Sequence, residues 1–188
     1  MGQHFTSLHN QFLIAMPALE DPNFFHSVTY ICEHTEDGAM GIVINHPMEL
    51  HLSDVLEQLD IPIDDPAIAS QALFLGGPVQ TERGFVIHEP VGQWESTLAT
   101  SKDIAITTSR DILSAIAAGQ GPNHTLVALG YAGWGPGQLE KEIADNAWLN
   151  CPADKAILFE HPTEKRWKAA ASLMGIDLDL LSMDAGHA

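Results

Sequence analysis

Residues 126–148 constrain the fold of this chain most strongly, because they combine a strand, a glycine-rich turn and a helix. The stretch opens with an apolar run typical of a buried strand. Four of the eight residues in 130–137 are glycine, a residue that tolerates positive φ and a close approach of another backbone. Leu139, Ile143 and Ala147 then follow at helical spacing on one face. The sequence therefore predicts a strand, a tight glycine turn and an amphipathic helix.

Strands dominate the first half of the chain, whereas strands and helices alternate in the second. Residues 27–33 alternate between two faces, and residues 40–45 are rich in β-branched side chains, so the two segments predict a β-hairpin. A further short strand is predicted at 156–159, followed by a last helix that begins after Thr163. We therefore expect an α+β fold with a mixed sheet, at least one parallel crossover and about four helices.

The length of 188 residues fits one compact domain over residues 1–182, with two closely joined lobes as the alternative. Residues 183–188 are expected to form a frayed tail. The chain has two cysteines and no signal-peptide pattern, which favours a reducing cytoplasm. No apolar run approaches the roughly 20 residues that span a bilayer, so no membrane segment is predicted.

The net charge of the chain limits the kinds of molecule that it can bind. Asp and Glu number 25 against 8 Lys and Arg, which gives a formal net charge of −17. Arg83 is the first basic residue, and twelve acidic residues precede it. Because nucleic-acid binding depends on cations that displace counterions from phosphates, this surface argues against direct contact with nucleic acid or with anionic membranes. The acidic surface serves solubility alone or forms a face for a basic partner.

Several segments taken together are familiar: LIAMP, SVTYICEH, DGAMGIVINHP, GGPV, ERGFVIH and ALGYAGWGPGQLEKEI. On these segments the chain resembles the AlgH/YqgE family of small bacterial proteins, over nearly its whole length. The resemblance implies an α+β fold of coiled, bifurcated sheets packed with helices, and a cytosolic protein. The family carries a label of transcriptional regulation, and the resemblance implies no catalytic residue, metal or cofactor.

A small polar ligand could bind at the glycine turn, where backbone N–H groups at a helix N-terminus favour negative charge. No Lys follows the turn as in a P-loop, so no nucleotide cofactor is predicted. The alternatives remain open: a plain turn with Trp134 packed on the sheet, and an Arg83 that makes a structural ion pair. The candidate ligand-binding residues are Arg83, His88, Tyr131, Trp134, Gly135, Gly137 and Gln138.

Cys32 and His34 lie two residues apart on an expected strand, so their side chains should share one face. A transition-metal site needs three or four such ligands, and no second pair at metal-binding spacing exists, so no metal is predicted. Cys32 is a candidate redox-sensing thiol, and the alternative is a buried apolar residue. Half of the basic residues are expected on a solvated face near the last helix: Lys155, Lys165, Arg166 and Lys168.

The sequence predicts a non-catalytic cytosolic regulatory or interaction protein, whose effect on transcription is indirect and passes through a protein partner. A small-ligand binder or enzyme that uses the turn around Trp134 with Arg83 and His88 is the alternative. A thiol or metal sensor that uses Cys32 and His34 is the second alternative.

Overall fold

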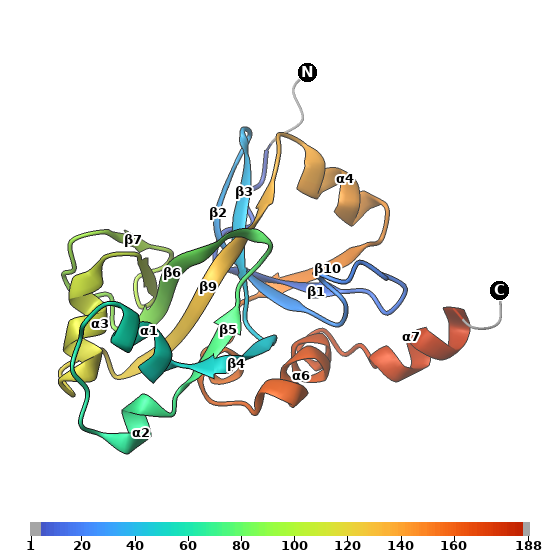
Figure 1. Ribbon diagram of the computed structural model, residues 1–188. Helices are drawn as coiled ribbons and strands as arrows, with labels where there is room; N and C mark the ends of the chain where they lie inside the picture. Colours follow the sequence, from blue (N-terminus) through green and yellow to red (C-terminus); the bar gives the residue numbers. More distant parts are fainter. Residues whose placement is uncertain (1–4, 186–188) are drawn as a thin grey trace.

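The computed structural model describes residues 5–185. Within these residues the chain forms ten strands (Figure 1): β1 (Gln11–Ala15), β2 (Val28–Thr35), β3 (Gly38–Val43), β4 (Pro47–His51), β5 (Ala72–Leu75), β6 (Val79–Glu89), β7 (Thr97–Ala99), β8 (Ala105–Thr107), β9 (His124–Trp134) and β10 (Trp148–Pro152). The same residues form seven α-helices and one 3-10 helix: α1 (Leu52–Gln58), α2 (Pro66–Ala69), α3 (Arg110–Ala117), α4 (Gln138–Ala144), α5 (Lys155–Phe159), η1 (Thr163–Lys165), α6 (Arg166–Ser172) and α7 (Leu178–Ala185).

The long strand β9 lies at the centre of the fold because it has a different neighbour at each end. On one edge it pairs with β6 in antiparallel orientation. On the other edge, residues 127–129 pair in parallel with β5, and residues 132–134 pair antiparallel with β3. The strand order is β10-β1-β2-β3-β9-β6-β8-β7, and the β4–β5 pair branches from β9. The sheet therefore divides where the neighbour of β9 changes from β5 to β3.

Three glycines allow the backbones to cross at this branch point. Gly130 has φ +78°, and a Cβ at this position would lie 2.6 Å from the Gly77 carbonyl oxygen. A Cβ on Gly77 would lie 2.1 Å from the Tyr131 backbone, and one on Gly76 would lie 2.4 Å from the Gly130 carbonyl oxygen. Real Cβ atoms do not approach backbone so closely, so only glycine fits at the branch point.

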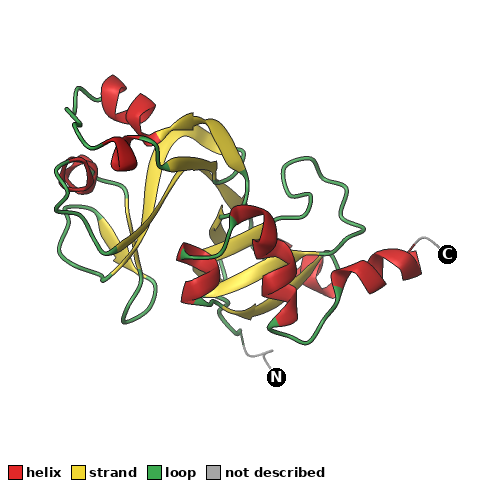
Figure 2. Ribbon diagram, turned by 90° about the horizontal axis from the view of Figure 1, so that it is seen from below, coloured by secondary structure: helices red, strands yellow, loops and turns green. Residues whose placement is uncertain are grey.

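Helices cover both outer sides of the strands (Figure 2). Apolar residues of α1 and α3 pack with Leu73, Val86 and Val127 on one part of the sheet. Helices α5, α6 and α7 cover the strands that form the largest buried cluster, around Phe12 and Tyr30. Helix α4 packs on the opposite face of β1 and β2. Within residues 5–185, no helix is long and apolar enough to cross a membrane.

The α+β class and the mixed, branched sheet expected from the sequence are confirmed. The sequence prediction placed the start of the glycine turn too early. Strand β9 continues through Gly130 and Gly133 and ends only at Trp134. The strand predicted at 156–159 is wrong. These residues belong to α5, where the Asp154 side chain accepts a hydrogen bond from the Ile157 N–H and starts the helix.

Seven α-helices rather than about four occur in the described part of the chain. The additional helices are α2, α5 and α7, of which α2 and α5 have only four and five residues. Such short helices show no clear helical periodicity in the sequence. Helix α7 reaches Ala185, so a helix occupies the first half of the expected frayed tail. The rest of that expected tail, 186–188, lies outside the described residues.

Candidate functional site

A cleft of about 950 Å³ opens beside the C-terminal end of β9. In Figure 1 the β2–β3 hairpin stands upright in the upper part of the molecule, and β6 and β7 lie to its left. Because β3 and β6 pair with opposite edges of β9, the hairpin forms one wall of the cleft and β6 and β7 form the other, while side chains of β6, β8 and β9 form its floor. The lining residues are Glu33, Thr35, Asp37, Gly38, Ala39, Met40, Val79, Arg83, Phe85, Ser96, Thr97, Leu98, Ile106, Thr108, Tyr131, Gly133 and Trp134.

The floor of the cleft is apolar. Phe85 and Ile106 are buried, and the Tyr131 ring meets the Phe85 ring edge-on with centroids 5.8 Å apart. Met40 of β3 is partly buried, while Leu98 of β7 is 46% exposed although it lines the same cleft. An aliphatic side chain left in solvent beside aromatic rings is a contact surface that a bound apolar group would cover.

The two walls carry opposite charge. Glu33 and Asp37 are exposed on the β2–β3 hairpin, and Arg83 is exposed on β6. The Arg83 guanidinium lies 5.4 Å from the Phe85 ring centroid, and its Nη1 donates to the Gln80 side-chain oxygen at 3.3 Å. None of the three charged groups takes part in an ion pair within residues 5–185. The cleft therefore presents three charged groups to whatever enters it.

The structure brings together three of the residues predicted to bind a ligand: Arg83, Tyr131 and Trp134 all line the cleft. Trp134 is only 6% exposed, and its indole N–H donates to Glu142 of α4 at 3.3 Å. Its ring packs among apolar residues that include Leu139. Trp134 therefore forms part of the cleft wall mainly as a packed side chain.

The remaining glycine-turn residues lie outside the lining of the cleft. Gly137 caps the start of α4 with φ 73°. The Gln138 side-chain oxygen accepts from the Gly135 N–H at 2.9 Å, and its amide nitrogen donates to Glu142 at 2.9 Å. These bonds hold the turn against its own helix, so Gly135, Gly137 and Gln138 do not join Arg83 in one site.

His88 is fully buried on β6, away from the lining of the cleft. Its Nδ1 lies 2.9 Å from the Pro90 carbonyl oxygen, which can only accept, so Nδ1 carries the proton. Its Nε2 then accepts from the Thr107 hydroxyl at 2.7 Å. Burial lowers the pKa of His88, and the bond to Pro90 opposes this only in part. Both ring nitrogens thus have internal partners, and the imidazole is held neutral.

Cys32 and His34 lie on opposite faces of the sheet, so the expectation of a shared face is wrong. Ile31 is opposite Gly41 while Glu33 is opposite Met40, which places a β-bulge at Cys32. The extra residue shifts the alternation of the strand by one position. The Sγ of Cys32 faces the main core, whereas the His34 ring accepts from the Leu8 N–H and donates to Glu140 of α4.

Cys32 is 3% exposed, and burial raises the pKa of its thiol. A thiol held in its protonated form reacts slowly with oxidants, because the thiolate is the reactive species. Within the described part of the chain, no three His, Cys, Asp or Glu side chains lie together as metal ligands. The geometry therefore favours the apolar alternative for Cys32.

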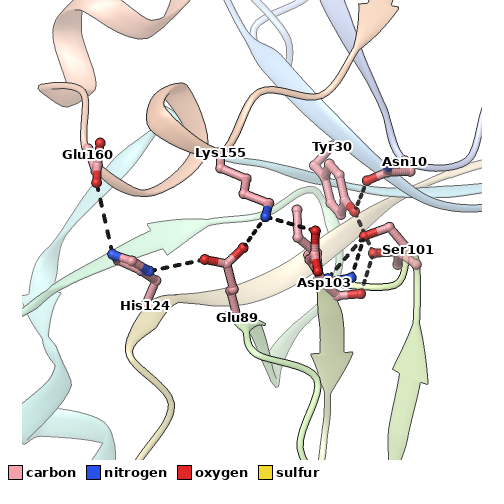
Figure 3. A network of polar contacts seen from close by, with 10 residues as sticks. Asn10, Tyr30, Glu89, Ser101, Asp103, His124, Lys155 and Glu160 are labelled. Carbon is pink, nitrogen blue, oxygen red and sulfur yellow. Dashed lines mark hydrogen bonds and ion pairs between the residues drawn. The ribbon is translucent and has the colours of Figure 1, made fainter.

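The four basic residues expected on a solvated face near the helix after Thr163, which is α6, do not form one such face. Lys155 bridges Glu89 of β6 at 2.7 Å and Asp103 at 2.9 Å, and this network joins α5 to the sheet (Figure 3). Arg166 is 6% exposed and donates to the Ile44 and His161 carbonyl oxygens. The expectation of a solvated face is wrong for Arg166, because its guanidinium secures the connection after β3.

The sequence interpretation missed most of the cleft, including Glu33, Asp37, Met40, Phe85 and Leu98. These residues come from separate strands, and only the folded sheet places them around one space. The available signals were Arg83, an isolated basic residue in an acidic segment, and the aromatic residues Tyr131 and Trp134 of the glycine-rich stretch.

The branched sheet and its open cleft define a class of small α+β proteins built around one shared central strand. The sequence model of the AlgH-like family, DUF179, matches residues 12–179, and the chain belongs to this family. The resemblance to the AlgH/YqgE family is thus confirmed.

Relatives match over almost their full length. A UPF0301 protein of Thioalkalivibrio sulfidiphilus is 65% identical over 179 residues, which cover 95% of this chain and 96% of the relative. The solution structure of the AlgH protein from Pseudomonas aeruginosa is 52% identical, with a TM-score of 0.80 and 97% of each chain covered. A protein of Corynebacterium diphtheriae, DIP2367, has a TM-score of 0.74, 20% identity and coverage of 96% and 94%, a likeness that shows the fold alone.

Proposed function

We propose that this protein is a non-catalytic regulatory protein of the cytoplasm that binds a segment of a partner protein in the cleft beside β9. Any effect on transcription is then indirect and passes through this partner. The observation that carries the proposal is the combination, in one open cleft, of an exposed Leu98, an aromatic floor and three charged groups that form no ion pair within residues 5–185.

The chemistry of the cleft matches that of protein contact surfaces. Interfaces bury apolar and aromatic groups at their centre and place polar groups at the rim. Here the Phe85 and Tyr131 rings lie at the floor, and charged side chains stand on the walls. The net charge of −17 opposes direct contact with nucleic acid or an anionic membrane, so the proposal assigns neither as a partner.

Gly133 offers a way to close the cleft without disturbing the fold. It lines the cleft, and a Cβ at this position would meet only the Tyr131 ring at 3.5 Å, an ordinary contact. We expect Gly133→Leu to fill the cleft. Gly135→Leu is the matched control, because Gly135 follows on the same segment, a Cβ there has equal room, and it lies outside the lining.

The test is site-specific photo-crosslinking in cells. A photoreactive residue is placed at Leu98, at the rim of the cleft, and for comparison at Leu180, an exposed position on α7. We expect one partner protein to crosslink from position 98 only, and to be lost in the Gly133→Leu background but not with Gly135→Leu. A crosslinked partner that persists with Gly133→Leu would rule out the cleft as its binding site.

A small polar ligand is the second candidate, favoured by the exposed guanidinium of Arg83, which has no carboxylate partner among the described residues. Such a group recognises carboxylate or phosphate through paired hydrogen bonds. A ligand at 100 times its dissociation constant adds about 2.7 kcal/mol to the free energy of unfolding, which raises the unfolding midpoint by roughly 5–10 °C. Nucleotides and metabolite carboxylates should be screened in this way, and a hit through the cleft should lose its shift in Arg83→Gln.

A further inference from the structure

We infer that the occupant of the cleft is a peptide segment with a defined charge order: a basic residue, an apolar residue and an acidic residue. This inference rests on the proposed function and names the partner that the cleft fits. The basic side chain faces Glu33 and Asp37, the apolar side chain covers the floor, and the carboxylate meets Arg83.

The charge order follows from the placement of the three groups. Glu33 and Asp37 belong to the β2–β3 hairpin, while Arg83 belongs to β6 across the cleft. Because these groups lack ion-pair partners within the described residues, an occupant with complementary charges gains attraction and displaces no internal ion pair. A uniformly basic segment would meet the Arg83 guanidinium, and a uniformly acidic one would meet both carboxylates. Only a segment of mixed charge is complementary to both walls.

The apolar position follows from the floor between the walls. Leu98 is 46% exposed at one side, and Phe85, Ile106 and Tyr131 form the surface beside it. Covering apolar area of this kind is favourable, because it removes the surface from water. A leucine-sized side chain between the two charged ends would bury this surface.

The exposed rim of the cleft, and not its volume, favours a peptide segment over a small molecule. Its volume of about 950 Å³ lies at the upper end for small-ligand pockets, roughly 300–1,000 Å³, and small-ligand pockets bury most of their ligand. Here Glu33, Arg83 and Leu98, which line the cleft from three different strands or their turns, are all exposed, so an occupant stays in contact with solvent. A peptide segment of a larger partner suits such a cleft because it need not be enclosed.

The test uses three fluorescent peptides with blocked ends and a central leucine. One is flanked by lysine and glutamate, one by two lysines and one by two glutamates. Binding is measured by fluorescence anisotropy on the full-length protein. We expect the mixed peptide to bind best, Arg83→Glu to prefer the doubly basic peptide, and the double variant Glu33→Lys, Asp37→Lys to prefer the doubly acidic one. Each preference should change by about tenfold, as for a charge pair turned from attraction to repulsion.

Matched controls reverse charges that lie outside the cleft. Glu36→Lys changes the same hairpin, and Lys165→Glu changes an exposed base on η1. Neither should alter the order of the three peptides. All substituted positions are exposed, and circular dichroism of each variant confirms that the comparison is made between folded proteins.

The outcomes separate this inference from the proposed function. The inferred charge order is overturned if the three peptides bind in the same order of affinity in all variants, or if no peptide binds at millimolar concentration. In either case, crosslinking from position 98 still tests separately whether a partner protein binds in the cleft. If binding persists in Gly133→Leu, both the inference and the proposed function fail. If 6-aminohexanoic acid, a zwitterion without peptide bonds, binds as tightly as the mixed peptide, the occupant is a small molecule and the peptide is overturned.

Discussion

The branch point and the cleft lie on the same strand, and their glycines differ in what surrounds them. At the branch point, Gly130 and Gly77 are packed against backbone so closely that no Cβ fits. At the cleft, Gly133 has room for a side chain and does not use one. The comparison shows that glycines close together in one sequence can be present for different reasons. At Gly130 a neighbouring backbone leaves no room for a Cβ, whereas at Gly133 the absence of a side chain leaves surface of the cleft uncovered.

The largest expected effect on stability comes from a pair of alanine substitutions that tests this difference. Gly130→Ala should lower the free energy of unfolding by about 3–5 kcal/mol, because it adds strain at positive φ to a clash with the Gly77 carbonyl oxygen. Gly133→Ala should change it by no more than about 1 kcal/mol. Urea unfolding of both variants measures the contrast. Equal losses at the two positions would remove the distinction between branch point and cleft.

The next test compares the floor of the cleft with its rim. Ile106 is 4% exposed, so Ile106→Ala should cost about 2–4 kcal/mol through lost burial and the resulting cavity. Leu98 is 46% exposed, and Leu98→Ala should cost less than about 1 kcal/mol. Chemical denaturation of the two variants measures these values. A large loss at Leu98 would mean that the rim supports the fold and is not a surface left for a partner.

The stability of the protein should depend on pH through His88, which is buried on β6. Its pKa is lowered by burial, so below about pH 6.5 the unfolded chain takes up a proton that the folded chain does not. The free energy of unfolding therefore falls as pH falls through this range, by at most about 1.4 kcal/mol per pH unit for each such histidine. His88→Gln should make this fall less steep in unfolding measured between about pH 7 and pH 5.

Some slope should remain in that variant, because desolvation also lowers the pKa of His26 and of His46. An unchanged slope in His88→Gln would show that the bonds of His88 to Pro90 and Thr107 do not hold its ring neutral.

The smallest expected effect is that of Arg83→Gln on stability. The side chain is exposed, and the interactions it makes are one hydrogen bond to Gln80 and a contact with the Phe85 ring. Its replacement should change the free energy of unfolding by about 0.5 kcal/mol or less, measured by urea unfolding. A clearly larger loss would assign Arg83 to the fold and would weaken its assignment to ligand or partner binding.

Much of the fold could be predicted from the sequence because local patterns specify local structure. The β2–β3 hairpin follows from alternation and β-branched residues, and α4 follows from the helical spacing of Leu139 and Ile143. Residues 156–159 misled the interpretation, because a short apolar run is equally compatible with a strand and with one buried turn of helix. There the Asp154 cap decided the outcome.

The candidate site could be predicted only in fragments. Arg83, Tyr131 and Trp134 were identified separately, and their meeting around one cleft depends on the long-range pairing of β9 with β3 and β6. The bulge at Cys32 shows the same limitation. A single inserted residue places His34 on the other face of the sheet, and no alternation rule applied to β2 alone reveals it.

The pairing of β1 with β10 has a consequence for how the protein is made. Residues 11–15 leave the ribosome early, but their outer neighbour is residues 148–152, near the end of the chain. Contacts of such sequence separation form late and slow the folding of a domain. During synthesis one edge of β1 therefore stays unpaired until β10 has been made. An unpaired edge is a site for pairing with another chain. A message truncated before codon 148 would release chains that keep this edge open. Nascent chains of this protein should accordingly depend on chaperones until residues 148–152 have been synthesised and can pair with β1.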